Sequence, residues 1–316
     1  MAANYWDSTQ AKYWTFTKPE LTTLRLALSH QNPTLATKHP LPDQRHLSIY
    51  IQNQLAKLAR RLNLRQQALA TAQIYLKRFY LRTDIRRTNP YLIMATAAYL
   101  ACKMEETPQH IRLMLGEAAR QWPELGVTET SKIGECEFAL ISTLQSRLIM
   151  HHPYRALGEL QGVFGLSGEE VALAGSVIND CFCTDLPLMY PPHVLAITAI
   201  FLAVVLRPAG QPAGLQAHSA ASAASASSSA TSTSTTPALS GNAAQTALAG
   251  FAGLKQAGPK LGKLVDWLAE SKVDMEAIVD ATQEMVSLYE VWESYSERGC
   301  KEVITRFMRE GGGIGK

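Results

Sequence analysis

The order of apolar and polar residues predicts a chain built from helices. Between residues 43 and 62, aliphatic side chains recur every three or four positions, at Leu47, Ile51, Leu55, Leu58 and Leu62. That spacing places them on one face of an α-helix. No segment alternates between apolar and polar residues as a half-buried strand would. We therefore predict an all-α fold.

Other segments continue the helical pattern. The stretch 64–82 repeats the same period, and helices are expected at about 108–121 and 128–148. Between them, PYLIMATAAYLACKM (90–104) is apolar on every side, which is typical of a central helix surrounded by others. Asn89 and Pro90 suit the cap and the first turn of this helix.

The central segment has a second copy further along the chain. Residues 90–104 align with PHVLAITAIFLAVVL (192–206), and the shared residues are Pro90, Thr96, Ala97, Leu100 and Ala101 with Pro192, Thr198, Ala199, Leu202 and Ala203. Upstream, Thr83-Asp84 is mirrored by Thr184-Asp185. Such a repeat predicts two similar helical bundles, each with a buried third helix.

A change of composition interrupts the second bundle. Residues 219–236 are all Ser, Ala or Thr, and the wider stretch 207–262 is rich in Gly, Pro, Ala and Ser. Such a segment buries too little apolar surface to offset its ordering entropy, so we predict a disordered insert. Because closure entropy grows slowly with loop length, the insert is compatible with the fold if its ends lie close together.

Composition narrows the classes of protein to consider. A net charge of +3 is too small to indicate nucleic acid as the main partner. We found neither a secretory signal nor an apolar run long enough for a membrane span. The five scattered cysteines indicate free core thiols in a reducing compartment. We expect a soluble intracellular protein without a cofactor, and no metal at Cys181 and Cys183, which lack a second ligand pair.

Charged residues close the first central helix. The sequence YLACKMEE (99–106) places Lys103 and two glutamates there, whereas the second copy has Val205 at the position of Lys103. The lysine is therefore not needed to bury the helix. Its charge can complement the helix dipole or contact another molecule. Glu137, one turn from Ile133 and Ile141, either needs a partner or lies at the solvated edge of its stripe.

Several of these stretches resemble the cyclin box. They are LRQQALATAQIYLKRFYLR (64–82), YLACKMEE (99–106) and ECEFALISTL (135–144). The wider chain, including NYWDS, HHPYR, INDCFCTDLPLMYPP and SKVDMEAI, is similar to the cyclin C group. The resemblance implies two tandem five-helix cyclin folds, with an N-terminal helix and a disordered insert in the second fold.

The resemblance also divides the chain. The expected parts are an N-terminal helical arm (1–42), a first cyclin box (43–150), a second cyclin fold (151–206 and 263–296), the insert (207–262) and a C-terminal tail (297–316).

A cyclin resemblance implies a regulatory role and no enzyme activity. Members of the family activate a cyclin-dependent kinase by packing against its mobile helix, and the cyclin C group partners the kinase of the Mediator complex. The implied function is therefore regulation of RNA polymerase II transcription in the nucleus. The family's kinase-binding positions match Lys103, Glu106 and Glu137, and no residue is expected to be catalytic.

A second set of positions matches a groove between the two folds. These residues are Trp6, Asn179, Asp180 and Tyr289, in a candidate dock for the large Mediator kinase-module subunits. Alternatively, Trp6 anchors the arm and Asn179-Asp180 lies on a solvated helix face. The stretch LSIYI (47–51) lacks the arginine of the substrate-docking patch of cell-cycle cyclins, so docking of that type is not expected.

Two other functions were weighed. A general transcription factor of the IIB type also has tandem cyclin folds, but a zinc ribbon and a strongly basic second repeat are absent from this chain. A helical scaffold without a kinase is the other alternative. The basic residues Lys77, Arg78, Arg82, Arg86 and Arg87 are either a solvated face or a site that attracts phosphate or acidic protein.

Overall fold

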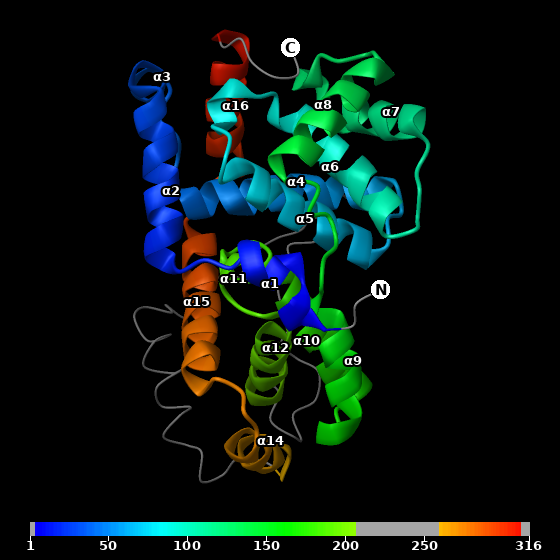
Figure 1. Ribbon diagram of the computed structural model, residues 1–316, viewed down its shortest axis with the longest axis vertical. Helices are drawn as coiled ribbons and strands as arrows, with labels where there is room; N and C mark the ends of the chain where they lie inside the picture. Colours follow the sequence, from blue (N-terminus) through cyan, green and yellow to red (C-terminus); the bar gives the residue numbers. More distant parts are fainter. Residues whose placement is uncertain (1–3, 207–258, 311–316) are drawn as a thin grey trace, which may run out of the picture.

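The computed structural model describes residues 4–206 and 259–310, and every regular element in these two ranges is helical. The all-α prediction is confirmed. Two helical bundles lie at opposite ends of the long axis of the molecule, and the N-terminal arm runs alongside both (Figure 1).

The first bundle surrounds a central helix, as the apolar pattern predicted. Its helices are α4 (Gln44–Arg61), α5 (Gln66–Tyr80), α6 (Pro90–Met104), α7 (Ile111–Gln121) and α8 (Thr130–Thr143). Helix α6 packs against the other four, and nearly all of its side chains are buried. It begins where predicted, because the Asn89 side chain accepts a hydrogen bond from the backbone N–H of Leu92 at 3.3 Å.

The second bundle repeats this arrangement. It consists of α9 (Pro153–Phe164), α10 (Gly168–Cys181), α12 (Pro192–Leu206), α14 (Pro259–Glu270) and α15 (Met275–Glu293). Helix α12 is the counterpart of α6 and contacts the other four. The repeated Thr-Asp pairs stand before the short helices η2 (Ile85–Arg87) and α11 (Leu186–Met189). The duplicated fold predicted from the repeat is confirmed.

Two predicted helices are shorter than expected. Helix α8 ends at Thr143 and not near residue 148, because Gln145 and Ser146 both adopt a φ of 56°, which breaks the helical backbone. Helix α7 begins at Ile111 and not at 108. The His110 ring caps it by accepting from the backbone N–H of Arg112 at 3.2 Å.

The N-terminal arm is a series of short helices and not a single one. They are η1 (Tyr5–Asp7), α1 (Thr9–Tyr13), α2 (Lys18–Gln31) and α3 (Pro33–Lys38). Helix α2 starts with a capping box between Thr17 and Glu20. The arm contacts both bundles: Trp14 is buried in the first core, and the backbone N–H of Phe16 donates to the carbonyl of Leu188 at 2.8 Å.

Most of the predicted insert lies outside the described residues, whereas most of the predicted tail is a helix. Residues 207–258 of the predicted insert lie outside the described residues, and residues 259–262 belong to α14. In the tail, α16 (Glu297–Glu310) is an amphipathic helix whose buried side chains Cys300, Ile304 and Phe307 belong to the first core. The chain thus returns from the second bundle to pack on the first.

The two cores meet at α4 and α5. Three residues of these helices, Ile49, Ala70 and Ile74, are buried in the second core, although their helices belong to the first bundle. Because these side chains are close-packed inside the second core, they fix the position of one bundle relative to the other. Within the described ranges, no helix combines the length and apolarity that crossing a membrane requires.

Candidate functional site

The charged residues at the end of α6 form an ion pair with α8. The Lys103 ammonium contacts the Glu137 carboxylate and also lies 4.6 Å from the centroid of the Tyr99 ring. The Lys103 side chain is 39% exposed and the Glu137 side chain 15% exposed. The pair is therefore held in place by the fold, with Glu137 Oε1 buried and the Lys103 side chain within reach of another molecule.

An exposed aromatic ring lies beside this pair in the sequence. Phe138 follows Glu137 on α8 and is 78% exposed. An exposed aromatic ring can supply apolar contact area to a protein partner. The sequence pattern did not single out Phe138; the available signal was an aromatic residue on the polar side of an amphipathic helix.

The two glutamates after Lys103 have different surroundings. Glu105 points inward, where its Oε1 accepts from Thr71 Oγ1 at 2.6 Å and lies 3.6 Å from His152 Nε2. His152 holds the pKa of Glu105 below its usual value, and the Thr71 hydrogen bond acts in the same direction against the effect of burial. Glu105 thus ties the end of α6 to α5 and to the segment that joins the bundles.

Glu106, in contrast, is exposed on the turn that follows. Its φ is 54°, a left-handed conformation, and its backbone N–H donates to the carbonyl of Lys103 at 3.3 Å. In the described part of the chain its carboxylate forms no ion pair. The structure therefore joins Lys103 to Glu137 and leaves Glu106 free to contact solvent.

Two of the predicted groove residues lie at the junction of the bundles. Asn179 Oδ1 accepts from Gln66 Nε2 of α5 at 2.9 Å and from the Tyr154 hydroxyl of α9 at 2.7 Å. The neighbouring Asp180 Oδ2 accepts from the Tyr289 hydroxyl of α15 at 3.1 Å. These bonds join α10 to three other helices and bring Asn179, Asp180 and Tyr289 into one region.

Burial changes the acidity of this region. It raises the pKa of Asp180 to about 6, against the hydrogen bond from Tyr289. Burial, together with the Asp180 charge, also raises the pKa of the Tyr289 hydroxyl. The Asp180 carboxyl therefore titrates close to neutral pH, unlike a carboxyl in water.

Trp6 contacts a different helix from the other three groove residues. Its ring is 62% exposed and lies 5.9 Å from the His193 ring, at the start of α12. Over the described ranges, no hydrogen bond or ring contact joins Trp6 to Asn179, Asp180 or Tyr289. The indole does not serve as a buried anchor for the arm; the buried Trp14 has that position.

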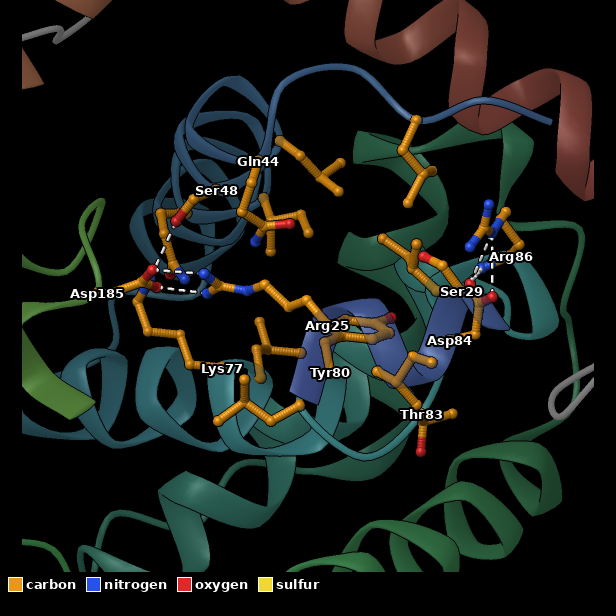
Figure 2. Close-up of a pocket in the computed structure, with 18 residues that line it drawn as sticks. Arg25, Ser29, Gln44, Ser48, Lys77, Tyr80, Thr83, Asp84, Arg86 and Asp185 are labelled. Atoms are coloured by element: carbon orange, nitrogen blue, oxygen red, sulfur yellow. Dashed lines mark hydrogen bonds and ion pairs between the residues drawn. The ribbon is translucent and has the colours of Figure 1, made fainter. Parts of the chain in front are cut away.

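The structure also contains a cavity that the sequence did not predict. It measures about 130 Å³ and lies between α2, α4 and α5 (Figure 2). Arg25 reaches across it to Asp185 with two hydrogen bonds of 2.7 and 2.8 Å, and Lys77 donates to Ser48 Oγ at 3.0 Å (Figure 2). Burial lowers the pKa of Lys77.

All five cysteines are buried and free. Over residues 4–206 and 259–310, no group of three or more His, Cys, Asp or Glu side chains is placed to hold a metal ion.

Comparison with known proteins gives the following matches. Residues 21–149 match the family "Cyclin, N-terminal domain". The chain is 52% identical to the "RNA polymerase II holoenzyme cyclin-like subunit" of Emericella nidulans, over 98% of each chain. It is 48% identical to the protein of the same name from Neurospora crassa, over 99% of each chain.

Two solved structures have a similar fold at low sequence identity. A chain of the CAK complex from Chaetomium thermophilum bound to ATP-γ-S superposes with a TM-score of 0.60 at 17% identity, covering 97% of this chain and 86% of the other. A chain of the yeast TFIIK complex (Kin28/Ccl1/Tfb3) gives a TM-score of 0.55 at 17% identity, covering 90% and 99%. At this identity the likeness concerns the fold alone.

Proposed function

Because the chain belongs to the cyclin family, among the RNA polymerase II holoenzyme cyclin-like subunits, we propose that it binds and activates a cyclin-dependent kinase in RNA polymerase II transcription. We further propose that this kinase is that of the Mediator complex, and that the protein acts in the nucleus as a subunit without catalytic activity of its own.

The ion pair between Lys103 and Glu137 is the observation that carries this proposal. A lysine ammonium has three donors, of which Glu137 occupies only part, and the Glu137 carboxylate retains acceptor capacity. A backbone carbonyl and a backbone N–H of a kinase helix would satisfy the remaining donors and acceptors. The exposed Phe138 ring supplies apolar surface beside them.

The inward glutamate supports the same role. Through Thr71 and His152, Glu105 fixes the turn that carries Lys103 and Glu106. A surface held in one conformation before binding loses less entropy on association. We expect Glu106, on the exposed side of this turn, to add a contact with the kinase.

The junction of the bundles supports a second contact. We propose that Asn179, Asp180 and Tyr289, together with the exposed Trp6, form a surface for the large subunits of the Mediator kinase module. Asn179 is hydrogen-bonded to Gln66 of the first bundle, and Asp180 is hydrogen-bonded to Tyr289 within the second, so a partner seated there would contact both folds at once.

Charge reversal tests the kinase contact. We expect Lys103→Glu and Glu137→Lys each to weaken kinase binding by about tenfold or more. Each variant places two like charges side by side at the contact, where the natural pair has opposite charges. Kinase affinity would be measured by titration, kinase activity by phosphate transfer to a polymerase-tail peptide, and folding by circular dichroism. The matched controls are Arg298→Glu and Glu302→Lys, which alter an exposed pair within α16.

The outcomes separate the proposed function from its alternatives. Full kinase activation by both folded variants would contradict the proposal and favour a scaffold without a kinase. Tight binding of duplex DNA by the unaltered protein, with no kinase activation, would favour a factor of the IIB type.

A further inference from the structure

Three arginines gather around two aromatic rings of the N-terminal arm. The guanidinium carbons of Arg78 and Arg82 lie 4.9 and 4.6 Å from the centroid of the Trp14 ring, and that of Arg147 lies 3.6 Å from the centroid of the Tyr13 ring. Arg78 and Arg147 are also joined, because Arg78 Nη1 donates to the Arg147 carbonyl at 3.5 Å. We refer to Arg78, Arg82 and Arg147 as the arginine cluster.

Among the described residues the arginine cluster has no acidic partner. Throughout the described ranges, none of its three guanidinium groups forms an ion pair with a carboxylate. Other arginines nearby do: Arg25 pairs with Asp185, and Arg86 pairs with Asp84. In the sequence, Arg78, Arg82 and Arg86 belong to one basic run. In the structure Asp84 neutralises Arg86, whereas Arg78 and Arg82 have no ion-pair partner among the described residues.

Arg78 is the member of the cluster with hydrogen-bond donors that are buried without acceptors in the described ranges. Its side chain is fully buried at 0% exposure, and its Nε and Nη2 atoms have no hydrogen-bond acceptor among residues 4–206 and 259–310. The Nε1 of the buried Trp14 ring also lacks an acceptor. Burial lowers the pKa of the Arg78 guanidinium to about 9, so the group keeps its charge at neutral pH. A buried, uncompensated cation is costly and attracts an anion strongly across a medium of low polarity.

We propose that the arginine cluster binds a phosphorylated segment of a partner protein. A phosphate monoester carries up to two negative charges and three acceptor oxygens, so one group can compensate more than one guanidinium. A single carboxylate carries only one charge. Arg82 is exposed and Arg147 half-buried, so these two would contact the phosphate directly, with the Arg78 charge behind them.

The surroundings favour a peptide over a nucleic acid. Tyr13 is 51% exposed beside Arg147 and offers a ring against which a peptide chain can pack. A nucleic-acid surface requires a longer basic track, and the chain has a net charge of only +3. This inference goes beyond kinase activation and does not depend on it, since the arginine cluster lies on and directly after α5 and after α8, and includes none of the proposed kinase-binding residues.

The test measures binding of a defined probe to the full chain. The probe is a fluorescein-labelled peptide with one phosphothreonine in a Gly-Ser context, followed by fluorescence anisotropy up to about 1 mM protein. We expect saturable binding that weakens with added salt, and about tenfold weaker binding by the double variant Arg82→Glu, Arg147→Glu. Both residues are at least partly exposed, and circular dichroism would confirm that the variant folds.

Two exposed arginines outside the arginine cluster provide a control variant with the same change of net charge as the double variant. Arg60→Glu combined with Arg298→Glu alters two exposed arginines and should change the affinity less than about twofold. If the control variant lost as much affinity for the peptide as the cluster variant, net charge alone would explain the loss and the proposal would be overturned. So would absence of saturable binding, equal affinity for the threonine or glutamate form of the peptide, or tighter binding of a single-stranded oligonucleotide through the same arginines.

Discussion

At the scale of single residues, adjacent side chains with the same chemistry have different roles. Glu105 and Glu106 follow each other, yet the first is hydrogen-bonded to Thr71 in the interior and the second is exposed in a left-handed turn. Asn179 and Asp180, an amide and a carboxylate of the same size, also face different helices, with Tyr154 and Tyr289 as their partners. The packing around each side chain, and not its type, decides whether it stabilises the fold or remains free to bind.

Asp180 gives a prediction about pH. Its pKa is raised from 3.8 to about 6 by burial, so the folded state binds its proton more tightly than the unfolded state. This contribution to stability is complete below pH 3.8 and is lost as the pH rises through 6. Asp180→Asn keeps an acceptor for Tyr289 without the charge. At pH 7 the variant should be more stable than the natural protein by on the order of 2 kcal/mol.

Urea unfolding of both proteins at several pH values between 4 and 7 measures this difference. The stability gain of Asp180→Asn should be small at pH 4 and grow as the pH rises, because only the natural protein must bury the charge. A gain that is the same at every pH would contradict the assignment.

At the scale of the helix, α6 and α12 show how one pattern serves two purposes. Both are central helices with buried faces on all sides, and both begin at a proline. Their ends differ: Lys103 in α6 pairs with Glu137, whereas Val205 and Leu206 in α12 are exposed apolar residues. The shared part of the repeat therefore builds the bundle, and the part that differs provides the candidate kinase contact in the first copy only.

The small residues of α6 give a prediction about packing. Ala97 is fully buried in the first core, and Ala97→Leu would force the surrounding helices apart. We expect the free energy of unfolding to fall by about 1–3 kcal/mol, measured by urea denaturation. The matched control is Ala172→Leu on α10, an exposed position where the same change should cost less than about 0.5 kcal/mol.

At the scale of the whole molecule, the ends of the chain hold the two bundles together. The arm contacts both, through Trp14 in the first core and through the ion pair of Lys18 with Asp280 of α15. After α15 the chain crosses back, and α16 completes the first core with Cys300, Ile304 and Phe307. Neither bundle is therefore built only from consecutive residues.

This arrangement predicts that the tail is needed for stability. Ending the chain after Ser296 removes α16 and exposes the part of the first core that it covers, so the melting temperature should fall by about 5 °C or more. Ending it after Glu310 removes only residues 311–316 and serves as the control. Equal melting temperatures for the two truncated forms would show that α16 adds nothing to the fold.

The sequence by itself determined the helical class, the position of the central helices, the duplication and the candidate role of Lys103. The helical class and the position of the central helices follow from local rules, because the period of 3.6 residues and the cap at Asn89 depend only on neighbouring residues. The duplication came from comparing two distant segments, and the candidate role of Lys103 from the resemblance to cyclins. Breaks such as the end of α8 at Thr143 were missed, since they depend on backbone angles that the apolar pattern does not specify.

Only the tertiary structure decided which distant residues meet. Lys103 and Glu137 pair because α6 and α8 are adjacent, and Glu105 reaches His152 because the linker between the bundles runs past α5. Arg78 is buried because Trp14 of the arm packs over it. Such contacts join residues far apart in the chain, and a local pattern cannot specify which helix faces will be neighbours.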